Sequence, residues 1–453
     1  MREVRIKDTL SGETIALDGT EEIGIYACGP TVYSRIHIGN ARPFVVFSLL
    51  ARFLKAEGYR AKLAINVTDI NDKIYTAAAE RGISSGELAE EMTAAYFEDT
   101  GRLGLGRPDA EPLATGTIGP IVDLIETLVE DGHAYESGGD VYFSVRGFDG
   151  YGKLSHRPTE EMEQGEGDDA GSLKRDPLDF ALWKTHKEGE DTSWDSPWGP
   201  GRPGWHIECS AMAEAELGQP FTIHGGGSDL VFPHHENEIA QSEAARGKPL
   251  ARIWMHNGMI ETDAEKMSKS EGNIFQLHEA IDTYGPEAVV AYLISGHYRQ
   301  PLAFGDAPLT EAVARIDRLR NFLRDNPAGL EPGPEAAAAA GRFRDALADD
   351  FNTPRAMSEA FDLVRSANQS PDDPALAGAG TALAGMLDLV GLGSLAEAGE
   401  GGPDPEALDL LEARNAARAD RDWGRADEIR DRLAELGWEV RDGAEGARLV
   451  PRG

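Results

Sequence analysis

The chain of 453 residues holds only two cysteines, Cys28 and Cys209. His234 and Glu238 lie four residues apart, so on a helix their side chains would share one face. Two thiolates, one imidazole and one carboxylate are a plausible ligand set for a borderline-soft cation such as zinc. Spacing alone leaves the set open, since two small buried cysteines are an equally ordinary reading. The side chains that compete for the same role are His224, His235 and Glu236.

A second candidate is the segment His37-Ile38-Gly39-Asn40, which separates an apolar run at 23–27 from a helical pattern at 41–54. The N-terminus of a helix offers free N–H groups and partial positive charge to phosphate groups. Gly39 lets a nucleotide approach the backbone closely, and His37 could donate to a phosphate oxygen as its charge develops. Four residues alone could equally be a helix cap with a surface histidine.

The segment Lys266-Met267-Ser268-Lys269-Ser270 places two ammonium groups within four residues. Lysine is otherwise scarce, and none follows Lys269. A loop of this composition can close over a triphosphate and neutralise the leaving pyrophosphate. Together with the histidine turn upstream, it favours an ATP-using enzyme over a solvated basic loop.

These two segments resemble the signature motifs of the class I aminoacyl-tRNA synthetases. That family usually has histidine as the fourth residue of the first motif, where this chain has Asn40, which can hydrogen-bond but cannot carry charge. The resemblance implies that an amino acid carboxylate attacks the α-phosphate of ATP, accompanied by Mg²⁺, and that the acyl group then passes to tRNA. It implies His37, Lys266 and Lys269 as catalytic residues. The implied ATP contacts are His37, Gly39, Asn40, His224, Lys266, Met267, Ser268 and Lys269.

Three longer segments, residues 27–33, 201–210 and 225–238, resemble the cysteinyl-tRNA synthetases within this class. The resemblance implies one Zn²⁺ per chain, with L-cysteine, ATP and tRNA(Cys) as the partners of a monomeric enzyme. The implied zinc ligands are Cys28, Cys209, His234 and Glu238, and the implied lining of the cysteine pocket is Thr31, Thr68, Trp205 and Asp229.

Zinc would suit this substrate because cysteine and serine differ by only one heavy atom. A pocket that senses size alone gains about 1–3 kcal/mol from so small a difference. Zinc binds thiolate strongly and lowers the pKa of a thiol, whereas a hydroxyl is a poor replacement. We therefore expect the metal to select the substrate, without taking part in the chemical step.

The elements that must position these residues follow an α/β pattern. Strand-like runs at 23–27 and 62–69 flank the helical pattern at 41–54, which makes a βαβ unit and predicts a parallel sheet. Ligands of such sheets bind at the carboxyl ends of the strands, where Cys28 and the histidine turn fall. We predict a Rossmann-like catalytic domain with an insertion, followed by a helical bundle and a small C-terminal domain. The predicted bounds are 1–110 and 200–255 for the catalytic domain, 111–199 for the inserted connective subdomain, 256–309 for the region of the lysine motif and stem contact, 310–395 for the bundle, and 406–453 for the tRNA-contacting C-terminal domain.

The charge balance is strongly acidic, with 44 Lys and Arg against 79 Asp and Glu and a formal net charge of −35. Such a surface predicts a halophilic protein, since salt screens the repulsion within a few ångströms. It also opposes non-specific phosphate binding, so tRNA contacts would depend on shape, stacking and hydrogen bonds. No apolar run approaches the roughly 20 residues that span a bilayer, so we expect a cytoplasmic protein without membrane contact.

Two other functions fit parts of the pattern. A ligase that joins cysteine to an amino sugar would share the ATP and zinc sites, but would not need the helical region or the arginine-rich tail around Trp423. A catalytically idle, zinc-stabilised binding protein would not need Lys266 and Lys269.

Overall fold

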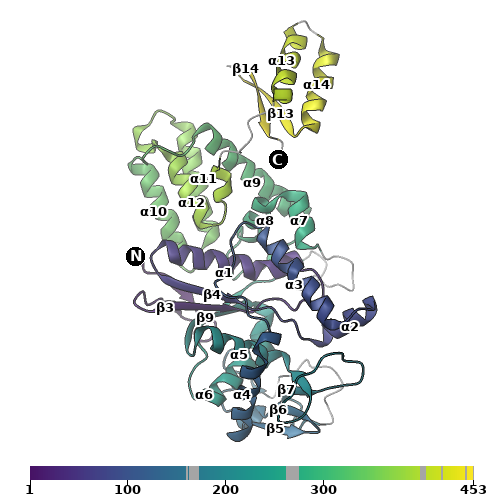
Figure 1. Ribbon diagram of the computed structural model, residues 1–453. Coiled ribbons are helices and arrows are strands. Elements are labelled where there is room, and N and C mark those ends of the chain that lie inside the picture. The colour runs from purple at the N-terminus through teal and green to yellow at the C-terminus, as the bar shows by residue number, and fades with distance from the viewer. Residues whose placement is uncertain are drawn as a thin grey trace.

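The computed structural model of the chain describes residues 1–159, 162, 173–261, 275–397, 405–419, 422–443 and 446–451. A parallel sheet lies at the centre of the molecule, with the helical bundle beyond one of its faces and the insertion beyond the other (Figure 1). The last small unit stands apart from the bundle at the far end of the molecule. The predicted α/β fold class is confirmed.

The central sheet is parallel throughout and has four strands. In spatial order they are β10 (Ala251–Asn257), β9 (Phe221–Gly227), β3 (Glu22–Ala27) and β4 (Arg60–Ile65). From β3 the chain moves outward to β4, and from β9 it moves outward to β10 in the opposite direction. The strand order therefore reverses between β3 and β9, and ligands of open α/β sheets bind at such a point, beyond the carboxyl ends of the strands.

Helix α1 (Ile38–Ala56) connects β3 to β4 and lies between the sheet and the bundle (Figure 1). Most of its residues are apolar and buried, because the helix packs on both sides. The His37 side chain caps its start by accepting from the backbone N–H of Asn40 at 3.3 Å. Pro43 is the sixth residue of the helix and lies inside it, where it has no N–H to donate to the carbonyl of Gly39.

The insertion has a sheet and an apolar core of its own. Helix α4 (Ile118–Glu130) precedes an antiparallel meander. The strands of the meander are β5 (Ala134–Ser137), β6 (Asp140–Phe143), β7 (Phe180–Thr185) and β8 (Gly201–Pro203). Before α4, residues 110–113 run parallel to β4, with the N–H of Ile65 donating to the carbonyl of Ala110 at 3.0 Å. The bounds of the domains stay a prediction.

The remaining elements support these two sheets or follow them. Those of the catalytic half are β1 (Arg5–Lys7), β2 (Thr14–Ala16), α2 (Asp72–Arg81), α3 (Ser85–Gly101), α5 (Trp205–Leu217), α6 (Glu236–Arg246), β11 (Ile260–Glu261), α7 (Leu277–Tyr284), α8 (Pro286–Leu293) and β12 (Leu302–Ala303). Those of the bundle are α9 (Asp306–Asp325), α10 (Pro334–Ala348), α11 (Thr353–Gln369) and α12 (Ala379–Leu389), and the last unit has α13 (Pro405–Ala419), α14 (Trp423–Glu435), β13 (Trp438–Gly443) and β14 (Gly446–Pro451). Among the described helices, none is both long and apolar enough to cross a bilayer.

Candidate functional site

Four buried side chains converge where the strand order reverses. Cys28 follows β3, and Cys209 lies on α5. His234 lies just before α6, and Glu238 lies in its first turn. The Sγ of Cys28 is 3.8 Å from the Sγ of Cys209 and 3.6 Å from Oε1 of Glu238, and Nε2 of His234 is 3.2 Å from that same oxygen. Metal–ligand bonds of about 2.0–2.3 Å in a tetrahedron put ligand atoms about 3.3–3.8 Å apart. The donor set therefore fits a zinc ion in both chemistry and spacing.

A second set of buried ligand atoms shares two members with the first. His235 Nε2 lies 3.3 Å from the Sγ of Cys28, and His224 Nε2 lies 2.8 Å from Oε2 of Glu238. The third competitor, Glu236, accepts from the backbone N–H of Ser155 at 2.8 Å and so faces the insertion. The structure brings all four predicted zinc ligands together and keeps two of the three competing side chains beside them.

Burial shifts the pKa of two of these side chains, His234 and Cys28. It lowers the pKa of His234 to about 3, so its imidazole is neutral near pH 7, as a metal ligand must be. Nδ1 of His234 lies 2.9 Å from Nδ1 of His206, which leaves Nε2 for the cluster. Burial, reinforced by Cys209 and Glu238, raises the pKa of the Cys28 thiol. A divalent cation would reverse that shift by favouring the thiolate.

A cavity of about 280 Å³ opens beside the cluster, and Cys28 belongs to both. It is lined by Cys28, Gly29, Pro30, Thr31, Tyr33, His37, Gly39, Asn40, Pro43, Lys73, Trp205, Gly227, Asp229, Leu230, Asn257, Gly258, Met259 and Ile260. This lining includes three of the four residues predicted for the cysteine pocket, and the three residues of the histidine turn that were predicted to contact ATP, namely His37, Gly39 and Asn40. A buried cluster of potential metal ligands and a helix N-terminus thus face one cavity.

Two predicted contacts lie behind the cavity wall. Thr68 is buried, and its N–H donates to the carbonyl of Pro30 at 3.1 Å, so it supports the strand end that carries Thr31. His224 is fully buried, with its ring stacked on Trp254 at a centroid distance of 4.4 Å. The structure therefore places His224 in the buried cluster of potential metal ligands, next to Cys28 but outside the lining of the cavity.

The predicted triphosphate contacts Lys266, Met267, Ser268 and Lys269 lie outside the described residues. The described residues on either side of them adjoin the cavity. Ile260, before the segment, belongs to its lining. After it, the carbonyl of Phe275 accepts from the N–H of Ile38 at 3.1 Å, beside the histidine turn.

Sequence reasoning missed Lys73 and the wall from Asn257 to Ile260. The wall begins at the carboxyl end of β10, so the apolar residues Ile253, Trp254 and Met255 just before it were the available signal. Lys73 lies in the first turn of α2, with its ammonium 5.5 Å from the centre of the Tyr33 ring. The sequence around Lys73 gave no comparable signal, because the position of α2 beside the cavity depends on tertiary packing.

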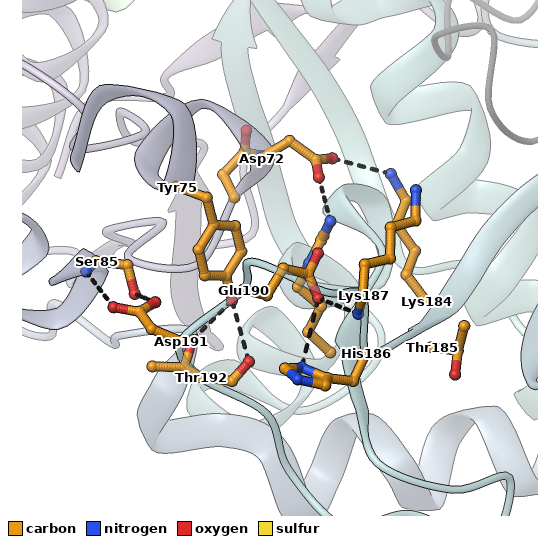
Figure 2. A network of polar contacts seen from close by, with 12 residues as sticks. Asp72, Tyr75, Ser85, Lys184, Thr185, His186, Lys187, Glu190, Asp191 and Thr192 are labelled. Carbon is orange, nitrogen blue, oxygen red and sulfur yellow. Dashed lines mark hydrogen bonds and ion pairs between the residues drawn. The ribbon is translucent and has the colours of Figure 1, made fainter. Parts of the chain in front are cut away.

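A polar network joins α2 to the insertion (Figure 2). Asp72, the residue before Lys73, forms an ion pair with the buried Arg202 on β8 and accepts from Lys184 at 3.1 Å. Arg202 also pairs with Glu190 at 3.1 Å. Asp191 and Thr192 extend the contact, since the N–H of Ser85 donates to Asp191 at 2.7 Å and Thr192 bonds the Tyr75 hydroxyl at 2.7 Å. The insertion therefore fixes the helix that carries Lys73 into the cavity.

Solved tRNA synthetases share this fold. The Mycobacterium tuberculosis methionyl-tRNA synthetase bound by methionyl-adenylate matches with a TM-score of 0.63 at 15% identity, over 86% of this chain and 94% of that chain. The LeuRS of Agrobacterium radiobacter K84, in a ternary complex, matches with a TM-score of 0.61 at 11% identity, over 84% of this chain and 86% of that one. At such identities the likeness concerns the fold alone.

Family models match most of the chain. The tRNA synthetases class I (C) catalytic domain matches residues 15–314, the DALR domain matches 342–392, and the Cysteinyl-tRNA ligase anticodon binding domain matches 401–448. The fold and the site thus define a class I tRNA synthetase.

Relatives that align over almost their whole length show which family within this class the chain belongs to. The cysteine–tRNA ligase of Azotobacter vinelandii is 47% identical over 446 residues, 96% of each chain, and that of Geobacter sulfurreducens is 45% identical over 474 residues, 98% of each. The chain belongs to the cysteine–tRNA ligase family, an enzyme family of ligases, and the resemblance drawn from the motifs is confirmed.

Proposed function

We propose that the protein activates L-cysteine with ATP and transfers it to the 3′ end of tRNA(Cys). The carboxylate of cysteine attacks the α-phosphorus, the bond to the leaving pyrophosphate breaks, and cysteinyl-adenylate forms. A ribose hydroxyl of the terminal adenosine then attacks the acyl carbonyl, and AMP leaves. The single observation that carries this proposal is the buried Cys, His and Glu cluster, which opens through Cys28 onto the cavity of the His37 turn.

We propose one Zn²⁺ per chain, held by Cys28, Cys209, His234 and Glu238. This set uses both buried thiols of the chain, and thiolates are preferred zinc ligands. When bound, the zinc ion would take the thiolate of the substrate as a further ligand and so favour cysteine over serine. We propose that His224 orients Glu238 through its 2.8 Å contact, in place of the ATP contact expected from the resemblance.

The cavity residues divide between the two substrates in this proposal. Thr31, Trp205 and Asp229 hold cysteine, with Thr68 supporting Thr31 from behind. The Trp205 ring lies 4.3 Å from that of His234, so it can cover the zinc side of the pocket. His37, Gly39 and Asn40 present the start of α1 to the phosphates of ATP and Mg²⁺. The motif assigns the triphosphate to Lys266 and Lys269, with Met267 and Ser268 between them.

The regions beyond residue 310 are proposed to bind tRNA(Cys). Support comes from the two family models that match there and from Trp423, which is 58% exposed at the start of α14 and free to stack on a base. A ligase for an amino sugar would have no need of an anticodon-binding unit. We further propose that the enzyme is monomeric and cytoplasmic.

Two assays test the proposal in sequence. Cysteine should drive exchange of labelled pyrophosphate into ATP, whereas serine at the same concentration should not. Transcribed tRNA(Cys) should then accept cysteine, with a tRNA of another specificity as the control. Exchange without charging would favour the amino-sugar ligase, and no exchange at all would favour an idle homologue.

A further inference from the structure

Arg42 is a fully buried cation directly beneath the histidine turn. It lies on α1, two residues beyond Asn40, and has no solvent exposure. Its Nη1 donates to the carbonyls of Gly258 and Met259, the latter at 3.2 Å, and its Nη2 donates to the carbonyl of His297 at 3.3 Å. One guanidinium therefore joins α1 to two separate chain segments through three backbone carbonyls.

The charge of this guanidinium is balanced by carbonyl dipoles, because no carboxylate within the described residues forms an ion pair with it. Burying a cation in this way is costly, and burial lowers the pKa of Arg42 to about 10. An apolar side chain would fill the same space at less cost. It would, however, leave the three carbonyls without these donors.

The segments held by Arg42 form one wall of the cavity. Gly258 and Met259 line it, at the carboxyl end of β10 and opposite the first turn of α1. The N–H of Gly258 donates to the carbonyl of Tyr298 at 2.7 Å, so the loop that carries His297 is bound to the same point. A Cβ at Gly258 would lie 2.4 Å from the backbone of Gln300, which shows how closely these two segments approach.

We propose that Arg42 is a positioning residue for ATP: it fixes the Gly258–Met259 wall relative to the His37 turn, so that the nucleotide cavity is already formed before ATP binds. This inference rests on the proposed ATP-dependent function. Arg42 itself touches neither substrate, and it acts through the backbone that it holds. Loss of the guanidinium should therefore weaken ATP binding more than cysteine binding, because the zinc cluster lies on other elements.

The test compares Arg42 with Arg52, which lies on the same helix. Arg52 also donates to backbone carbonyls of two segments, those of Asp388 at 3.0 Å and Leu105 at 3.2 Å, but neither residue lines the cavity. We would measure KM for ATP and for cysteine by pyrophosphate exchange in Arg42→Met, Arg42→Lys and Arg52→Met. The Kd of MgATP by calorimetry and Tm would be measured in the same proteins.

We expect Arg42→Met to raise KM and Kd for ATP at least tenfold, while KM for cysteine stays within twofold. Arg42→Lys should show a smaller rise of about threefold, because one ammonium cannot reach both segments. Arg52→Met should leave both KM values within twofold of the original. If Arg42→Met does not fold, the threefold change in Arg42→Lys becomes the criterion.

Two outcomes would overturn the inference. One is an ATP affinity within twofold of the original in a folded Arg42 variant, with only Tm lowered. The other is an equal rise of KM for ATP and cysteine. Failure of the proposed function is seen separately, as absent exchange in the unaltered protein, and the Kd of MgATP still decides the role of Arg42 in that case.

Discussion

At the scale of single residues, the question is which imidazole would complete the proposed metal site. His234 and His235 are neighbours, both are buried, and each places Nε2 within reach of the cluster. They differ in their other ring nitrogen, since Nδ1 of His234 meets His206, whereas Nδ1 of His235 meets His256. The set Cys28, Cys209, His234 and Glu238 is favoured because it contains both thiols. Substituting each histidine in turn can distinguish it from the set with His224 and His235.

His234→Asn should lose zinc. Loss of a supporting partner of a metal ligand costs about 10–100-fold in metal affinity, and loss of the ligand itself should cost more. We expect zinc content, measured by mass spectrometry after dialysis against a weak chelator, to fall from one per chain to less than a fifth. His235→Asn should keep its zinc and serves as the matched control. The reverse pattern would assign the site to Cys28, His224, His235 and Glu238.

Buried histidines should also make the metal-free protein sensitive to acid. Burial lowers the pKa of His256 to about 3, whereas it is about 6.5 in the unfolded chain. Because the folded-state pKa is the lower one, the unfolded state binds the proton first. Stability is therefore full above pH 6.5 and falls as the pH drops towards 3. Between pH 6.5 and 5 one such histidine should cost about 2 kcal/mol.

His256→Asn should remove that share of the pH dependence. We would compare urea unfolding of the zinc-free protein at pH 7.5 and pH 5.0 in His256→Asn, in the original chain and in His133→Asn, a control outside the cluster. An unchanged pH dependence in His256→Asn would show that this imidazole is not buried in its neutral form.

At the scale of elements, the insertion acts on the cavity through α2. The buried Arg202 connects β8 with Asp72 and Glu190, and Lys73 follows Asp72 directly. Breaking a buried ion pair such as Arg202–Glu190 by removing one partner typically costs about 3–5 kcal/mol, whereas a pair with an exposed side chain such as Asp72 contributes about 0–1 kcal/mol. The network in Figure 2 should therefore determine how firmly α2 is held.

Arg202→Met should lower Tm by several degrees and should speed amide hydrogen exchange in α2. Arg146→Met offers a matched control in the same insertion, because Arg146 pairs with Asp176 at 2.5 Å but its side chain is 59% exposed. Equal effects of the two substitutions on exchange in α2 would argue against a structural role for the network.

At the scale of the whole molecule, the formal charge of −35 dominates. Repulsion among surface carboxylates acts over about 10 Å at 0.1 M salt and about 3 Å at 1 M. The halophilic character expected from composition therefore stays a prediction about stability in solution.

Tm should rise with KCl between 0.1 M and 2 M, since screening removes repulsion that favours the unfolded chain. Sorbitol at matched osmolality is the control, because it alters hydration without screening charge. Full stability in dilute buffer, with no gain on adding KCl, would contradict the halophilic reading.

The sequence by itself determined the features that are local in the chain. The apolar runs and the helical pattern predicted β3, α1 and β4, because periodicity follows from backbone geometry. The two signature segments and the three longer segments identified the family, because each is a continuous run of residues that can be recognised without the fold. The types of ligand available for a metal were also evident from composition.

Only the tertiary structure decided which of those side chains meet. Cys28 and Cys209 are 181 positions apart, and their approach depends on α5 packing against the sheet. Periodicity could not show that Thr31 lines the cavity whereas Thr68 lies behind the lining. It also could not show that Arg42 donates to the backbone carbonyl of Gly258. Such contacts depend on long-range packing, and no local sequence pattern predicts which side chains far apart in the chain will meet.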